Sequence, residues 1–461
     1  MSVLSGAADL TSRTWARRLA VAVVGLALLV ILYEFGVANL VKAQLRPTIY
    51  VSTFPVFCVA VIAAATRFSK ASVVAGWTTG LWGPQLGIIG LQLIDYAVAG
   101  ALLVVVVTRL RGAPQRARHI VLRLCLPYGL FCIVIGGFWP QDLPNRELQI
   151  RILLLGTLSA MAMAAVGFEI KHVARALVVV GLPFAIASTQ TAGIEGRDVA
   201  VLGQNVNAAA FLIAIALIAA VVGCVQDRRL FIPLYLASLP LLWAGIWACR
   251  SRGSFIIIVM SVLAILCHRL YAGRNAAGWI GLATFAVLSS WVATIVFTSA
   301  GQFTERFVEG ADLDTFNRRT AFEYFLYRAS LHPLTGAGLG NAVAEAEADP
   351  FAVNADLNSH DMFSGVASQV GFIPLGLFLA LVLAALLNAR AQSRWTSALL
   401  VPIIVSLFSL NWVAASILTP VELSILVWIA SYDPPRPYAG RRRQSVDATP
   451  LGPLPALIPA R

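Results

Sequence analysis

Residues 204–224 read QNVNAAAFLIAIALIAAVVGC, a run that is apolar from Ala208 onward and contains no charged side chain. A helix of this length spans the roughly 30 Å hydrocarbon core of a membrane. Comparable apolar runs recur along the chain from Leu19 to Ala430, among them 72–108, which is long enough for two spans broken near Gly83, and 361–388. The sequence therefore predicts a chain that crosses a membrane many times.

The composition leads to the same prediction. Of the 461 residues, 59% are hydrophobic and only 12% are charged, and the mean hydropathy is +0.81. Soluble domains carry roughly 25% charged residues, so this chain has too few polar groups to cover a water-exposed surface. We expect an all-α polytopic membrane protein, a bundle of about 12–14 transmembrane helices with one long periplasmic loop.

The basic residues predict the orientation of the bundle. With the N-terminus in the cytoplasm, 23 of the 34 Lys and Arg residues fall in cytoplasmic segments and 11 in outer ones, as the positive-inside rule requires. The rule explains the net charge of +12 without a nucleic-acid partner, since no soluble segment interleaves basic and aromatic residues. The six cysteines contain no C-x-x-C pair, so they are predicted to be small core residues.

The one long polar stretch, 300–360, falls on the outer side and carries nine acidic residues and four arginines. Loops of this length are usually functional. We therefore divide the chain into N-terminal membrane helices at 1–196, a region at 197–433 that contains this loop, and a cytoplasmic tail at 434–461. The tail combines Pro, Gly and a basic run, and we expect it to be disordered.

Arginines on the outer side oppose the charge bias, so each of them needs a physical reason. Arg250 and Arg252 flank Ser251 in a hinge between two apolar runs, Arg197 precedes the run quoted above, and Arg318 lies in the long loop. The planar guanidinium suits two-point contacts with phosphate, which makes a phosphate clamp one interpretation. Snorkelling to lipid headgroups and simple solvation are the alternatives.

Two outer motifs give weaker signals. Residues 335–341, TGAGLGN, have the alternate glycines of a nucleotide-binding loop but follow no predicted strand. Alternate glycines more simply allow the loop to turn tightly against the bundle. Asp312 and Asp314 form a D-x-D pair of the kind found in metal-dependent sugar-nucleotide enzymes, but such a pair is expected by chance in so acidic a loop. We predict no cofactor and no metal.

His360 lies in NSHD at 358–361, where the long loop meets the next apolar run. Histidine exchanges a proton near neutral pH, so His360 is a candidate general base, with helix capping as the alternative. A carboxylate beside it, that of Asp361, would favour the protonated imidazolium. Asn205 and Asn207 are predicted helix caps, a role compatible with an anion at the same helix start.

Taken in order, these segments resemble the O-antigen ligase and O-antigen polymerase superfamily. Arg197 with 203–207 is similar to the "R…G…NPN" segment of that superfamily, and 251–253 to its "SRG" hinge. Arg318 with 332–341 is similar to the segment "R…W…HPL-G-G-GN". Each motif is short, and the ordered set is more specific than any member.

The resemblance continues with His360, which is similar to the histidine that opens the next span of the family, and with 371–376, similar to its "G-GL". It covers about 197–388, while the first part of the chain shares only the hydrophobic architecture. The departures are Val206 where the family often has Pro, Phe322 where it often has Trp, and Asp361 where it often has Asn.

The resemblance implies a class-C glycosyltransferase fold and transfer of a glycan from undecaprenyl pyrophosphate to an acceptor hydroxyl. The site would face the periplasm from a bacterial inner membrane. The acceptor is a second lipid-linked glycan in a polymerase and lipid A-core or a protein in a ligase, and both stay open. The residues implied are His360 and Asp361 as catalytic groups and four arginines as pyrophosphate ligands, namely Arg252, Arg318, Arg197 and Arg250.

A lipid or polysaccharide transporter or flippase is the alternative from another class, with the outer arginines holding a phosphate. Transporters usually place their substrate sites near the middle of the membrane. The few acids within the apolar runs are Glu34, Asp95 and Glu422, and no Arg or His accompanies them. This pattern favours the surface-facing enzyme.

Overall fold

A computed structural model describes residues 67–82, 89–137, 146–191, 206–249, 251–272, 277, 280–281, 284, 322–339, 362–409 and 419–432. Every regular element in these ranges is helical. Seven of the described helices are long and apolar enough to cross a membrane. These helices confirm the prediction of a polytopic α-helical membrane protein. Some of the expected 12–14 spans lie outside the described residues. The tail at 434–461 and most of the long loop lie outside them as well.

The first half of the described chain forms helices joined by short connections. They are α3 (Ser69–Trp82), α4 (Ile89–Arg109), α5 (Gln115–Ile120), α6 (Leu126–Gly137), α7 (Arg146–Val166) and α8 (Ile170–Thr191), with η2 (Leu110–Gly112) and η3 (Val121–Cys125) on either side of α5. α3 ends directly before Gly83, where the sequence predicts a break in the long run. α5, η3 and α6 follow one another without a break and form a single apolar helical segment that is long enough to cross a membrane.

The second half contains the run that decides the fold, which becomes α9. Its helices are α9 (Val206–Gln226), α10 (Ile232–Cys249), α11 (Arg252–Tyr271), α16 (Met362–Val370), α17 (Phe372–Gln392), α18 (Arg394–Ser409) and α19 (Thr419–Ser431), with η4 (Arg229–Phe231) before α10. A further helix covers 322–331. The predicted run at 361–388 is not one helix, because Gly371 separates α16 from α17.

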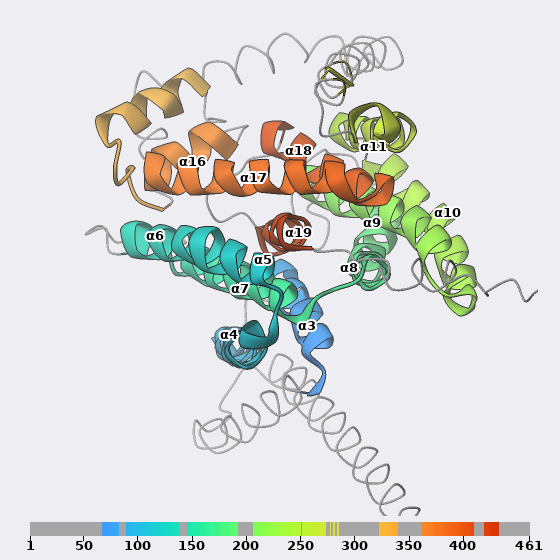
Figure 1. Ribbon diagram of the computed structural model, residues 1–461, viewed down its shortest axis with the longest axis horizontal. Coiled ribbons are helices and arrows are strands. Elements are labelled where there is room, and N and C mark those ends of the chain that lie inside the picture. The colour runs from blue at the N-terminus through green and yellow to red at the C-terminus, as the bar shows by residue number, and fades with distance from the viewer. Residues whose placement is uncertain are drawn as a thin grey trace, which may run out of the picture.

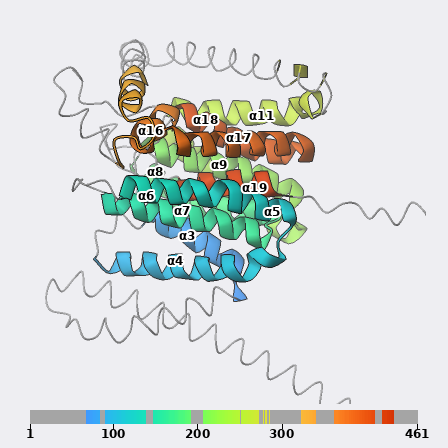
Figure 2. The same ribbon diagram turned by 60° about the vertical axis from the view of Figure 1, so that its left-hand side comes forward.

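The long helices lie side by side, and α19 occupies the middle of the bundle (Figures 1 and 2). Every residue of α19 is buried, and the helix packs against α7, α17, α18 and α3. α8, α9 and α10 form a second packed group, which α11 and α18 join to the first. Three of the described cysteines, Cys125, Cys132 and Cys249, are buried free thiols, as predicted for small core residues.

Small residues set the distance between the helices of the second group. A Cβ atom added to Gly181 of α8 would lie 2.3 Å from the Cβ of Ala216 on α9. One added to Gly245 of α10 would lie 2.7 Å from the Cα of Ala185 on α8. Close backbone approach at glycine and alanine is the usual way in which membrane helices gain packing contacts.

One end of the bundle, here called the polar end, is tied together by side chains that bridge helix termini. The hydrogen bonds are Lys70 to His172 at 3.2 Å, Arg116 to the Ala430 carbonyl at 2.9 Å, Arg390 to the Tyr271 carbonyl at 2.8 Å and Asn388 to the Ile429 carbonyl at 2.6 Å. α3 and α8 therefore begin at the polar end, while α11, α17 and α19 end there.

The opposite end of the bundle, here called the motif end, holds the starts of α9, α11 and α16. Asp227, which follows the last turn of α9, contacts Arg175 near the start of α8. α9 therefore ends at the polar end, and its start lies at the motif end. In Figure 2, α16 lies at one end of the bundle and α5 at the other. The described starts of α9, α11 and α16, which adjoin sequence motifs, thus share one end of the bundle.

Candidate functional site

The motif end joins two segments that are 44 residues apart in the sequence. The Ser251 hydroxyl donates a hydrogen bond to Oδ1 of Asn207 at 3.1 Å. Asn207 lies in the first turn of α9, and the buried Ser251 directly precedes α11. The sequence places these two motifs on the same side of the membrane, and the structure brings them into contact.

Arg252 is the first residue of α11. The preceding residue, Ser251, is extended with φ −85° and ψ 121° and makes no side-chain cap hydrogen bond, because its hydroxyl is turned to Asn207. The first amides of a helix have no carbonyl partner within the helix, and they form the positive end of its dipole. The start of α11 thus combines an arginine position with amides that the Ser251 side chain does not cap, an arrangement that attracts anions.

The glycine segment, residues 332–339, packs against the break between α16 and α17. Its backbone hydrogen bonds run from the Ala337 amide to the Ser368 carbonyl at 2.6 Å, from the Gly338 amide to the Gln369 carbonyl at 2.9 Å, and from the Phe372 amide to the Pro333 carbonyl at 2.8 Å. Backbone groups at a helix break inside a membrane protein need partners of this kind. The glycine segment supplies them.

Two glycines make this close contact feasible. Gly336 has a φ of +63°, and a Cβ atom there would lie 2.3 Å from the carbonyl carbon of Gln369. Gly371 has a φ of +85°, and its Cβ would lie 2.5 Å from the carbonyl oxygen of Leu334. Only glycine fits such positions without strain. The prediction that the alternate glycines of 335–341 let the loop turn tightly against the bundle is confirmed at Gly336, while Gly340 lies outside the described residues.

The glycine segment also anchors the helix that begins beside the candidate base. α16 starts at Met362, directly after His360 and Asp361, and has nine residues. Its buried polar side chains include Ser364, Ser368 and Gln369. The anchored end of α16 therefore lies about 13 Å along the helix axis from the start that follows His360.

Most of the predicted site residues lie outside the described part of the chain. For Arg252 the structure describes the backbone position. Those outside the described ranges are Arg197, Arg250, Arg318, His360 and Asp361, together with Asp312 and Asp314 of the D-x-D pair. Their roles stay predictions.

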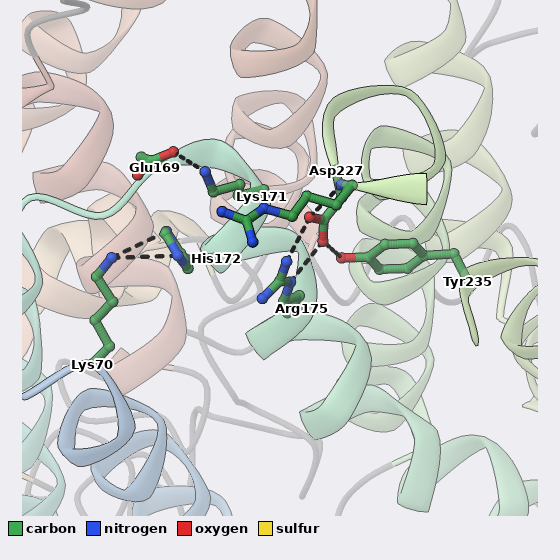
Figure 3. A network of polar contacts seen from close by, with 8 residues as sticks. Lys70, Glu169, Lys171, His172, Arg175, Asp227 and Tyr235 are labelled. Atoms are coloured by element: carbon green, nitrogen blue, oxygen red, sulfur yellow. Dashed lines mark hydrogen bonds and ion pairs between the residues drawn. The ribbon is translucent and has the colours of Figure 1, made fainter. Parts of the chain in front are cut away.

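The polar end contains a charge network that the sequence reasoning missed (Figure 3). Nε and Nη2 of Arg175 donate to the two carboxylate oxygens of Asp227, both at 2.6 Å, and the Tyr235 hydroxyl donates to Oδ2 at 2.7 Å. The Arg175 guanidinium holds the pKa of Asp227 well below its usual range. A single acid in the otherwise basic segment 227–229 is the signal that could have revealed the network.

Two histidines of the basic segments also differ from expectation. The sequence predicts side chains that are solvated or reach toward the membrane surface for His119, which is exposed in the structure, and also for His172 and His268. In the structure both are partly buried: His172 contacts Nζ of Lys70 at 3.2 Å, and Nδ1 of His268 lies 3.3 Å from the Ser397 hydroxyl. Both contacts join helix termini at the polar end, which indicates a structural role.

Glu422 is fully buried in α19, close to the start of that helix. Neither of its carboxylate oxygens has a hydrogen-bond partner among the residues that the structure describes. The neighbouring Ser406 hydroxyl donates its hydrogen to the Ile403 carbonyl at 2.7 Å instead. An ionised carboxylate without partners is costly to bury, so this group needs either a proton or a bound cation.

The motif end combines an uncapped helix start, an arginine position and a helix break held by the glycine segment. This combination suits an anionic group that approaches from the membrane surface. No protein-family model and no curated protein matches this chain.

Proposed function

We propose that this protein is a glycosyltransferase of a bacterial inner membrane. It transfers a glycan from undecaprenyl pyrophosphate to an acceptor hydroxyl at the periplasmic face, in the polymerisation or ligation of a surface polysaccharide. The observation that carries the proposal is the hydrogen bond between Ser251 and Asn207. It joins two motifs that the sequence identifies separately, and it turns the Ser251 side chain away from the first amides of α11, which begins with Arg252.

The donor pyrophosphate is assigned to the start of α11. Arg252 and the first amides of this helix supply positive charge there, with Arg318, Arg197 and Arg250 as further ligands. The lipid chain of the donor stays in the membrane. Because arginines stabilise the charge that develops on the leaving group, the proposed reaction is independent of metal and needs no nucleotide.

The proposed reaction exchanges one bond at the anomeric carbon of the donor glycan. The acceptor oxygen bonds to this carbon while the bond between the carbon and the pyrophosphate oxygen breaks, so undecaprenyl pyrophosphate leaves. His360 takes the proton of the acceptor hydroxyl, which contributes about 10²–10⁴-fold to the rate. Asp361 orients the imidazole ring. The glycine segment holds the far end of α16, the helix that follows these two residues.

The charge distribution over the described residues supports the orientation. Basic residues gather at the polar end, namely Lys70, Arg109, Arg111, Arg116, Arg118, Lys171, Arg175, Arg228, Arg229, Arg269, Arg390 and Arg394. Few accompany Arg252 at the motif end. By the positive-inside rule we therefore assign the polar end to the cytoplasm and the motif end to the periplasm, the side on which the proposed transfer takes place.

Glu422 favours the second candidate function, a lipid or polysaccharide transporter or flippase. Acids buried within a membrane bundle often mark the path of an ion or substrate. A transporter moves the lipid-linked glycan between leaflets and leaves its length unchanged. A transferase lengthens the glycan or moves it to another acceptor, so product analysis separates the two functions.

Replacement of Arg252 by lysine tests the donor site. Lysine keeps the charge but loses the planar fork, so we expect Arg252→Lys to lower the turnover of a lipid-pyrophosphate donor about tenfold or more. Arg111→Lys, an exposed position at the polar end, is the matched control and should turn over like the wild type. Equal turnover of both variants would show that Arg252 does not bind the leaving group.

Chelation tests the metal-independent chemistry. Turnover by the purified protein should be unchanged after incubation with EDTA, since arginines supply the positive charge. A strict requirement for a divalent cation would contradict this and would direct attention to Asp312 and Asp314 as metal ligands.

A further inference from the structure

Glu422 lies deep within the bundle, and the proposed transfer reaction does not use it. Its helix, α19, occupies the middle of the bundle (Figure 1), and its carboxyl group is fully buried. Glu422 precedes Ser431, the last residue of α19, by nine residues, which corresponds to about 14 Å along the helix axis from the polar end. Water does not solvate this carboxyl group, so an ionised form would need a partner inside the protein.

The helices around Glu422 contribute no counter-charge. Those that pack against α19 are α3, α5, α7, α17 and α18, and within α19 no other residue is ionisable. Their titratable groups with described side chains are Lys70, Arg116, Arg118, His119, Arg151, Arg390 and Arg394. Arg151 lies five residues before Gly156, the position on α7 that meets Thr419 at the start of α19, and the others lie at the polar end. None of these groups faces Glu422, so among the described residues its carboxyl group has no ionic partner.

Ser406 of α18 is a polar neighbour of Glu422, and its hydroxyl hydrogen is already in use. The hydroxyl donates this hydrogen to the Ile403 carbonyl at 2.7 Å, so that only the lone pairs of Oγ are left for Glu422. An ionised carboxylate is also only an acceptor, and two acceptors repel. A protonated carboxyl group has a hydrogen to donate. The two side chains are therefore complementary only when Glu422 carries a proton.

A metal ion suits these surroundings less well than a proton. Hard cations such as Mg²⁺ and Ca²⁺ take about six or more oxygen ligands. The described residues contain no group of three or more His, Cys, Asp and Glu side chains. The Ser424 hydroxyl, two residues after Glu422, is engaged with the Pro420 carbonyl at 2.5 Å and with the Trp77 indole at 2.9 Å. A proton needs a single acceptor, and Ser406 provides it.

We propose that Glu422 is a proton-binding site in the middle of the bundle. The neutral carboxyl group donates a hydrogen bond to Oγ of Ser406 and thereby joins α19 to α18. When the proton leaves, a charge without a partner is buried at this contact, so the packing of α18 on α19 depends on the proton. The site is separate from the proposed donor site at the start of α11, and its tests require no glycan donor.

Chemical modification tests whether the proton is present. Dicyclohexylcarbodiimide, an apolar reagent, takes the proton of a neutral carboxyl group on one nitrogen while its central carbon bonds to the carboxyl oxygen, and the adduct rearranges to a stable N-acylurea. The full-length protein in phospholipid vesicles is treated near neutral pH, and the adduct is located by mass spectrometry. We expect the adduct on Glu422 and its loss in Glu422→Gln. Asp227 is the matched control, because its side chain is equally buried but paired with Arg175, and it should stay unmodified.

The unfolding equilibrium tests the same proton without a reagent. Glutamine has the size of a protonated glutamate and can also donate to Ser406, so Glu422→Gln should unfold like the wild type at about pH 5. At higher pH the wild type keeps its proton when folded and loses it on unfolding, so its stability falls as the pH rises. The ratio of its unfolding constant to that of Glu422→Gln should increase about tenfold per pH unit between about pH 5 and pH 7, measured by thermal unfolding in mild detergent.

Three results would overturn the proton site. They are an unmodified Glu422, an adduct equally abundant on Asp227, and a difference between the wild type and Glu422→Gln that does not change with pH. Protection of Glu422 by sodium chloride but not by choline chloride would overturn it as well, because a metal ion would then hold the carboxylate. Glycan transfer by a protein whose Glu422 stays unmodified would keep the proposed function and remove the proton site. A modified Glu422 in a protein that transfers nothing would have the reverse meaning.

Discussion

Asp227 accepts two hydrogen bonds from Arg175, one from Tyr235 and one from the Arg228 amide. Its side chain is fully buried, and the Arg175 guanidinium also stacks over the Phe231 ring at 3.6 Å. Asp227→Asn keeps the shape but removes the charge that Arg175 faces. We expect the free energy of unfolding to fall by about 2 kcal/mol, measured by thermal unfolding of the purified protein. Tyr235→Phe should cost about 1 kcal/mol, and a variant as stable as the wild type would contradict the assignment.

The same residue predicts a pH dependence. Because Arg175 lowers the pKa of Asp227 in the folded protein, the stabilisation is fully present above the ordinary carboxyl range and is lost as pH falls through the lowered pKa. The difference in melting temperature between the wild type and Asp227→Asn should stay constant from neutral pH to about pH 5 and shrink below about pH 4. A difference that disappears near neutral pH would exclude this mechanism.

His360 gives the residue-scale test of the proposed chemistry. His360→Ala should abolish transfer while donor binding persists, because a base acts on the acceptor and not on the pyrophosphate. Transfer by the wild type should fall as the imidazole becomes protonated at low pH. Asp361→Asn should move this acidic limb to lower pH, since it removes a carboxylate that favours the imidazolium. Normal turnover by His360→Ala would leave this residue as a helix cap.

At the scale of elements, the glycine segment makes a prediction about the helix break. In Gly336→Ala the new methyl group would meet the Gln369 backbone at a positive φ. We expect a loss of about 2 kcal/mol or more in stability and a loss of transfer with it. Gly100→Ala on α4 is the control, because its Cβ meets nothing within 4 Å, and it should be neutral or slightly stabilising.

Elements were predictable where one physical rule dominates. The apolar run at 204–224 predicts α9 because length and hydropathy alone decide whether a segment spans a membrane. The same rule misses the break at Gly371, because apolar composition continues through it. The break depends on a contact with 332–339, a segment distant in sequence, which no local pattern reports. The Arg175–Asp227 pair was missed for a similar reason, since it joins α8 to the end of α9.

The sequence predicts the candidate site only as a set of positions on one side of the membrane, and most of these positions lie outside the described residues. Sequence order and charge bias place the motifs together, and the contact between Ser251 and Asn207 agrees with this arrangement. The uncapped start of α11 was not predictable, because it depends on where the Ser251 hydroxyl turns.

At the scale of the whole molecule, the account predicts which end faces the outside. Single cysteines replacing Tyr327 near the motif end and Leu230 at the polar end occupy exposed positions. In a background without native cysteines, a membrane-impermeant thiol reagent added to intact cells should modify Tyr327→Cys and spare Leu230→Cys. Glu345→Cys and Arg443→Cys should repeat this pattern. Labelling of the opposite pair would place the motif end in the cytoplasm.

Glycan transfer by the purified protein tests the central claim most directly. Vesicles containing the protein receive a synthetic oligosaccharide on undecaprenyl pyrophosphate, together with the acceptor, either the same lipid-linked glycan or lipid A-core. The account predicts a longer or transferred glycan and an equal amount of released undecaprenyl pyrophosphate. A donor that stays intact with every acceptor, or that only moves between leaflets without a change in glycan length, would contradict the account.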